Sequence, residues 1–209
     1  MQSAAPTHDE SKGTARLEAF SDGVFAIAIT LLALNLQIPH VESNSEKWAL
    51  AHALFQQWPS YVAFITSFFT VLIMWMNHHA IFKFVHKVNA RILFANGILL
   101  LFTTAVPFVT GLDSEYLNHR EATTACAVYT GSFVLISLAY NYLWLTVIKD
   151  RSLLKSDISD HALQKITKNY SLGIPLYLAA FAGSFVSIYL GIGICTALWI
   201  FWSVTVKDL

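Results

Sequence analysis

Residues 17–38 read LEAFSDGVFAIAITLLALNLQI, and this stretch decides the fold class. It holds the acidic residues Glu18 and Asp22 near its start and carries no charge from Val24 onward. A helix rises about 1.5 Å per residue, so about 20 mostly apolar residues cross the roughly 30 Å hydrocarbon core of a bilayer. The stretch therefore predicts a membrane-spanning helix.

The composition of the whole chain agrees with this prediction. Of the 209 residues, 56% are hydrophobic and 12% are charged, whereas soluble domains carry about 25% charged residues. A soluble enzyme, a nucleic-acid binder and a disordered chain are therefore disfavoured. The two cysteines, Cys126 and Cys195, lie in apolar runs and indicate neither a disulfide framework nor a zinc site. Residues 1–15 lack the apolar core of a secretion signal, so we expect no cleaved leader.

Further apolar stretches predict five more spans. The apolar stretch 170–206 is too long for one span, and we expect its break near 184–187 or at Gly191 and Gly193. The predicted spans cover 17–38, 59–81, 92–112, 122–148, 170–186 and 188–206. We also expect a short interfacial helix at 47–58 and a cytoplasmic helix at 160–168, capped by Ser159 or Asp160. The fold class is therefore an all-α polytopic membrane protein, with residues 1–209 forming one six-helix transmembrane domain.

The distribution of Lys and Arg predicts the orientation, because cytoplasmic loops are enriched in these residues. One side carries Lys12, Arg16, Lys83, Lys87, Arg91, Lys149, Arg151, Lys155, Lys165, Lys168 and Lys207. The other side carries Lys47 and Arg120. We therefore expect both termini to face the cytoplasm.

Ionisable residues inside a span are costly and usually paired or functional. Arg16 and Asp22 are six residues apart and lie on different faces of a helix, so Asp22 needs a partner from another helix. The candidates at the same depth are His78, His79 and Arg91. One interpretation is a metal or catalytic site. Adjacent histidines point about 100° apart and no further cluster completes a metal site, so we favour an interhelical hydrogen-bond network.

The first span also has an apolar stripe. On a helical wheel, Phe20, Leu31, Leu34 and Ile38 fall within about 40° of Ile27, and Thr30 lies at the edge of the stripe. Such a stripe normally faces lipid or packs against a neighbouring helix. The alternative is a hydrophobic constriction that lines a pore and gates it by dewetting.

These residues resemble the first-helix signature of the transmembrane protein 175 family of potassium channels. The resemblance rests on Arg16 followed by FSDGVFAIAITLL at 20–32, on WMNHH at 75–79, and on Asn96 and Pro107-Phe108 in the third span. It covers nearly the whole chain. It implies that six-helix repeats assemble around an axis and that the first helix of each repeat lines the pore. A single repeat implies a homotetramer.

The resemblance also implies the function and the residues that carry it. It implies a passive, potassium-selective channel of the plasma membrane that needs no cofactor and is not an enzyme. The matching pore and selectivity positions are Ile27, Leu31 and Leu34, and Thr30 is the one hydroxyl near them that is placed to contact an ion. The positions that hold the first three helices together in the family correspond here to Arg16, Ser21, Asp22, Trp75, His78 and Asn96.

A secondary transporter and a membrane-embedded enzyme are the two alternatives to a channel. A proton-coupled secondary transporter would use Asp22 with His78 or His79, but such carriers usually place polar sites at the midplane, where this first span is apolar. Pro107 and Pro175 are candidates for the broken helices of a carrier. A membrane-embedded enzyme would need a convergent catalytic cluster, and the sequence shows none.

Overall fold

The computed structural model describes residues 8–42, 46–156 and 158–207, and regular structure in these ranges is helical. The expectation of no cleaved leader concerns residues 1–15, of which 1–7 lie outside the described residues. The helices are α1 (His8–Leu31), α2 (Ala49–Gln56), α3 (Trp58–Phe82), α4 (Ala90–Tyr116), α5 (Ala122–Ile148), α6 (Asp160–Ser184) and α7 (Ile188–Lys207). Two 3₁₀ turns, η1 (Leu32–Asn35) and η2 (Arg151–Leu153), follow α1 and α5. The predicted all-α fold class is confirmed.

Several helix starts follow ordinary capping chemistry. The side chain of Asn89 accepts a hydrogen bond from the backbone N–H of Ile92 at 3.0 Å and begins α4. Ser159 does the same for Ala162 and begins α6. Pro59 lies in the first turn of α3, where the absence of its N–H costs no helical hydrogen bond.

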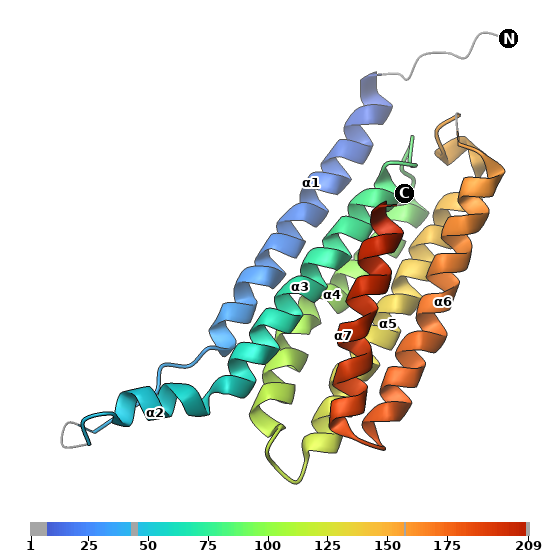
Figure 1. Cartoon of the computed structure of the whole chain (residues 1–209). Helices are drawn as coiled ribbons and strands as arrows, with labels where there is room; N and C mark the ends of the chain where they lie inside the picture. Colours follow the sequence, from blue (N-terminus) through green and yellow to red (C-terminus); the bar gives the residue numbers. More distant parts are fainter. Residues whose placement is uncertain (1–7, 43–45, 157, 208–209) are drawn as a thin grey trace, which may run out of the picture.

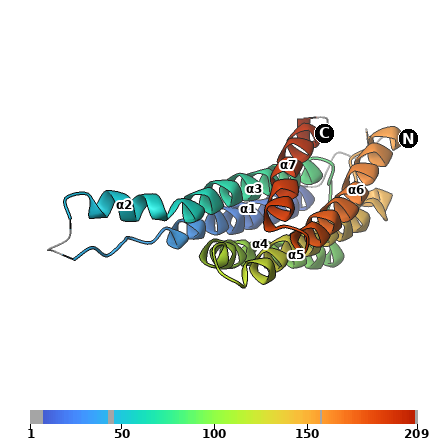
Figure 2. The ribbon, with the colours of Figure 1, turned by 60° about the horizontal axis from the view of Figure 1, so that its bottom comes forward.

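The six long helices form an elongated bundle, whereas α2 projects away from it (Figure 1). One half consists of α1, α3 and α4, which contact one another, and the other half consists of α5, α6 and α7. The halves meet where α4 packs on α5 and where α3 packs on α7. Figure 2 shows α1 beside α3, with α2 continuing outward in line with α3. α1 begins and α7 ends at the same end of the bundle (Figure 1).

Two loops are joined at that same end of the bundle. The backbone N–H of His86 donates to Leu153 at 2.7 Å, and that of Lys155 donates to Phe84 at 3.0 Å. The loop after α3 and the loop after α5 therefore tie the two halves together. Within the second loop, the hydroxyl and the backbone N–H of Ser152 donate to the carboxylate of Asp150 and lower its pKa.

Five described segments are long and apolar enough to cross a membrane. One is Gly13–Asn35, which contains most of α1 and all of η1, and the other four are α3, α4, α5 and α7. α6 has 25 residues and is not among them, because polar residues of its first half, among them Lys165, Lys168 and Asn169, keep its mean hydropathy low. The helix predicted at 160–168 and its cap at Ser159 are confirmed, but the helix does not end at Lys168: it runs on without a break into the predicted fifth span. No glycine or proline interrupts the chain between Ser159 and Gly173, so the helix continues.

The first span also differs from its predicted range. α1 begins at His8 rather than at residue 17, because apolarity marks the part of a helix in the membrane rather than its start. α1 ends at Leu31 and tightens into the 3₁₀ turn η1, and the backbone is extended from Leu36 toward Pro39. The fifth and sixth long helices are separated at 185–187, which overlaps the first of the two expected breaks.

Candidate pore-lining face and interhelical polar network

α1 has one face that is buried within the protomer. This face packs against α3 and α4. Its residues are at most 1% exposed: Ser21, Phe25, Ala28 and, in the following turn, Leu32. The buried face fixes the rotation of α1 about its own axis, because turning the helix would expose Ser21 and Phe25 and bury the opposite face.

The opposite face of α1 carries the predicted stripe and has no cover within the protomer. Ile27 is 58% exposed, Leu31 is 41% exposed and Leu34 is 74% exposed. Leu34 stays on the same side as Leu31 although it lies in η1, because three residues make one full 3₁₀ turn, whereas Ile38 lies beyond the last helical turn. The described residues of one protomer leave these side chains largely uncovered. Their role in a pore stays a prediction.

Thr30 presents an oxygen beside this stripe. Its hydroxyl donates to the backbone carbonyl of Ile27 at 2.9 Å, and its side chain is exposed. Because the proton of the hydroxyl is used within the helix, the lone pairs of the oxygen remain available. A cation is bound by such lone pairs, so the local geometry is compatible with ion contact.

A buried chain of hydrogen bonds connects α3, α4 and α1. His78 Nε2 lies 2.8 Å from Asn96 Oδ1, Asn96 Nδ2 donates to Ser21 Oγ at 2.9 Å, and Ser21 donates to the carbonyl of Leu17 at 2.9 Å. All three side chains are at most 1% exposed. Since the carbonyl oxygen of an amide only accepts, His78 carries its proton on Nε2. The ring of His78 is also held between Phe25 and Phe82.

A second set of contacts lies beside this chain and is more exposed. Trp75 Nε1 donates to Asp22 Oδ1 at 2.8 Å, and the ring of Trp75 stacks on His79. His79 Nδ1 lies 3.8 Å from the carboxylate of Glu18. The partner of Asp22 is therefore the indole of Trp75, and the predicted partners His78, His79 and Arg91 were wrong.

The structure brings together five of the six residues predicted for the interhelical network. Arg16 is the exception: its side chain is exposed and makes no hydrogen bond or ion pair with the described residues. Asp22 forms no hydrogen bond with His78 or His79, so the geometry does not assemble the proton-transfer pair of the transporter hypothesis. Within the described part of the chain, no group of three or more His, Cys, Asp or Glu side chains is arranged to hold a metal ion.

One contact at the other end of α1 was not predicted. Asn35 Nδ2 donates to the carbonyl of Pro107 in α4 at 3.0 Å. A Cβ atom at Gly111 would lie 2.7 Å from Asn35 Oδ1, so only glycine leaves room for this amide. The contact holds η1 and therefore Leu34 against α4. An asparagine at the end of an apolar run and a glycine four residues after a proline are the signals in the sequence.

Comparison with known proteins identifies the family to which the chain belongs. The model of the family described as "Endosomal/lysosomal potassium channel TMEM175" matches residues 16–107. A potassium channel of Chamaesiphon minutus is 45% identical over 93% of this chain and 95% of its own length. The chain belongs to this family. The matched relative and the family model are both named as potassium channels, and ion channels are not enzymes. This agrees with the expectation that the protein is not an enzyme.

Two further comparisons support membership in the TMEM175 family. A potassium channel of Streptomyces collinus is 39% identical over 82% of this chain and 82% of its own length. The crystal structure of a lysosomal potassium-selective channel TMEM175 homologue from Chamaesiphon minutus has a TM-score of 0.83. It is 44% identical and covers 93% of this chain and 98% of that chain. The protein is therefore a multi-pass membrane protein of the TMEM175 fold.

The family match and the polar network occupy the same part of the TMEM175 chain. Residues 16–107 contain α1 from Arg16 onward, α3 and most of α4. These are the helices that Ser21, His78 and Asn96 join.

Proposed function

We propose that this protein is a passive, potassium-selective cation channel formed by four copies of the chain around a central axis. The observation that carries the proposal is the uncovered apolar face of α1, with Ile27, Leu31 and Leu34 exposed in the protomer. Relatives over nearly the whole chain are named potassium channels, which supports the same function. The proposal includes no cofactor other than the permeating K⁺.

In the proposed tetramer, four copies of α1 place rings of Ile27, Leu31 and Leu34 around the axis. Rings of aliphatic side chains narrow the pore until ions shed part of their water, and K⁺ gives up water at lower cost than Na⁺. Methyl groups offer no oxygen ligands in return. The four Thr30 hydroxyls lie next to these rings and present the oxygen atoms that the rings lack.

We further propose that the channel lies in the plasma membrane with both termini in the cytoplasm. α1 begins and α7 ends at the same end of the bundle (Figure 1), which supports termini on one side. The two loops paired at that end contain most of the basic residues among the described loops: Lys83, Lys87, Lys149, Arg151 and Lys155. Basic loops stay on the cytoplasmic side.

The experiment that tests the pore is ion flux from liposomes that contain the purified protein. Ile27→Asn should wet the constriction and raise Na⁺ flux relative to K⁺ flux. The matched control is Ile200→Asn on α7, because Ile200 is 73% exposed and lies in another predicted span. A reversal potential that shifts in Ile27→Asn but not in Ile200→Asn supports a pore lined by α1. Unchanged selectivity in Ile27→Asn rejects it.

The subunit number is tested by the mass of the protein–detergent complex. A mass of four chains, after subtraction of bound detergent, supports the proposed assembly. A monomer that still conducts would place the pore within one protomer and would remove the role proposed for α1.

A further inference from the structure

A second face of α3 receives hydrogen bonds from aromatic side chains of the other half of the bundle. Trp199 Nε1 donates to Thr70 Oγ1 at 2.8 Å, and the hydroxyl of Tyr140 donates to the carbonyl of Met74 at 2.6 Å. The hydroxyl of Tyr170 lies 3.5 Å from the carbonyl of Asn77. The acceptors are spaced by four and three residues and lie on one side of α3.

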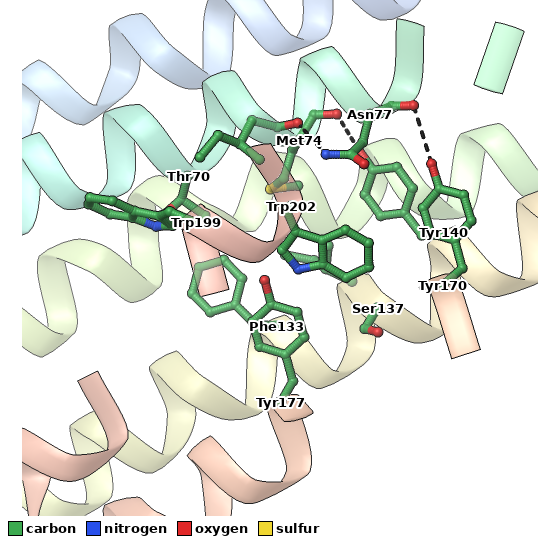
Figure 3. A pocket seen from close by; sticks show the side chains of 12 residues that line it. Thr70, Met74, Asn77, Phe133, Ser137, Tyr140, Tyr170, Tyr177, Trp199 and Trp202 are labelled. Atoms are coloured by element: carbon green, nitrogen blue, oxygen red, sulfur yellow. Dashed lines mark hydrogen bonds between the residues drawn. The ribbon is translucent and has the colours of Figure 1, made fainter. Parts of the chain in front are cut away.

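These contacts surround a cavity between α3, α5, α6 and α7, whose lining includes no residue of α1 (Figure 3). The volume of the cavity is about 40 Å³, and a polar cavity of roughly 10–15 Å³ or more holds a water molecule. Half of the residues that line the cavity are aromatic. They are Phe133, Tyr140, Tyr170, Tyr177, Trp199 and Trp202.

Two polar atoms in the wall of the cavity have no hydrogen-bond partner within the described residues. They are Asn77 Oδ1 and Ser137 Oγ, and each of these side chains is only 4% exposed. The amide nitrogen of Asn77 already has a partner, because Nδ2 donates to the carbonyl of Ile73 at 2.9 Å. Asn77 Oδ1 therefore requires a donor from outside the protein, since a buried acceptor without a partner is costly.

The cavity sets limits on the chemistry of its occupant. It has no carboxylate among its lining residues, so it offers no charge to hold a cation. It is too small for an aromatic ligand, since cavities that bind benzene are about 150 Å³. A full set of water molecules would need two to four polar partners for each molecule. The wall offers few such partners and much apolar surface.

We propose that this cavity is a binding site for a short-chain alcohol of up to three heavy atoms. The hydroxyl of the alcohol donates to Asn77 Oδ1 or bonds with Ser137, and its alkyl part contacts the aromatic wall. Water at Asn77 Oδ1 and Ser137 Oγ occupies only part of the site when no alcohol is present. The site lies on the back of the helix that positions His78, the residue next to Asn77. The proposal does not rest on the identity of the permeating ion or on the position of the pore.

The test uses the full-length protein in detergent and measures its melting temperature in methanol, ethanol and 1-hexanol. When ethanol equals its dissociation constant, binding doubles the ratio of folded to unfolded protein. For so small a ligand that constant is about millimolar or weaker. The wild-type melting temperature should therefore fall less steeply with ethanol than that of Asn77→Leu. The matched control is Ser132→Ala on α5, because Ser132 donates to the carbonyl of Tyr129 and does not line the cavity.

The length of the alcohol separates this site from general effects of alcohols on the micelle. Partitioning into detergent or lipid grows with chain length, whereas this cavity excludes 1-hexanol. Protection that is present with ethanol, absent with 1-hexanol and lost in Asn77→Leu supports the site. Equal slopes in wild type and Asn77→Leu, or protection that increases toward 1-hexanol, overturn it. If Asn77→Leu does not fold, Ser137→Ala replaces it, and crystals soaked in ethanol must show density beside Asn77 Oδ1.

Discussion

The buried hydrogen bonds that join His78, Asn96 and Ser21 should stabilise the protein as one connected chain. Substitutions at two successive members, alone and combined, should then have non-additive effects on the free energy of unfolding. Ser21→Ala removes the acceptor of Asn96 Nδ2 and leaves this buried N–H without a partner. Stranding a buried donor costs about 1–3 kcal/mol, and interhelical hydrogen bonds in membranes average about 0.6 kcal/mol. We therefore expect Ser21→Ala to lower the free energy of unfolding by about 1 kcal/mol.

In an Asn96→Leu background, the same Ser21→Ala change should cost almost nothing. The amide that it would strand has already been removed, so the two changes should be non-additive by about 1 kcal/mol. Asn96→Leu alone should cost more than Ser21→Ala, because it strands the Nε2–H of His78, which is 1% exposed. Unfolding in mixed micelles of increasing denaturing detergent, followed by tryptophan fluorescence, measures each free energy.

Thr103→Val is the matched control for this cycle. Thr103 is also fully buried on α4, but its hydroxyl donates only to the carbonyl of Leu99 in the same helix. Its loss strands no side chain, so it should add to Asn96→Leu independently. If Ser21→Ala cost the same in both backgrounds to within about 0.5 kcal/mol, the limit for independent sites, the reasoning about a connected chain would be refuted.

Three further predictions follow from single contacts. Trp75→Phe removes the donor to Asp22 and should weaken the packing of α1 on α3 by about 1 kcal/mol, which the same unfolding assay measures. Gly111→Ala places a Cβ 2.7 Å from Asn35 Oδ1, so it should displace the turn after α1 and alter flux selectivity, as measured in liposomes. Thr30→Val keeps the shape of the side chain but removes its oxygen, so a lower K⁺/Na⁺ permeability ratio is expected, whereas an unchanged ratio would show that Thr30 contacts no ion.

The two faces of α1 were predictable from the sequence because both follow from helical periodicity. Ile27 and Ser21 are six residues apart and lie on different faces of a regular helix, and the structure exposes one and buries the other. The wheel applies as far as Leu34, because a 3₁₀ turn advances about 120° per residue and three residues bring Leu34 back over Leu31. It does not apply to Ile38, which lies beyond the last helical turn. Where a helix tightens depends on contacts such as that between Asn35 and Pro107, which periodicity does not contain.

The partner of Asp22 was not predictable, because only ionisable side chains were considered as partners of its carboxylate. At this depth the carboxylate is satisfied by the neutral N–H of Trp75, a residue that hydropathy counts as apolar. An indole is a hydrogen-bond donor only and pairs well with a carboxylate in a partly apolar setting. Tryptophan and tyrosine therefore count among the hydrogen-bond donors between membrane helices: Tyr140 and Trp199 likewise donate to the carbonyl of Met74 and the hydroxyl of Thr70 on α3.

Exposure alone does not distinguish a pore-lining helix from a lipid-facing one. In both α1 and α7, 28% of the membrane window is buried within the protomer, compared with 44% in α4 and α5. The difference lies in what each helix presents beside its apolar face. α1 places the exposed hydroxyl oxygen of Thr30 next to its stripe, and its opposite face is joined to two other helices by the Ser21–Asn96–His78 chain. α7 is joined to α3 by the bond from Trp199 to Thr70, and its threonine hydroxyls are half-buried at Thr196 and buried at Thr205. A ring of side chains that meets a permeating ion needs an exposed oxygen beside it, and this observation supports the proposal that α1 rather than α7 lines the pore.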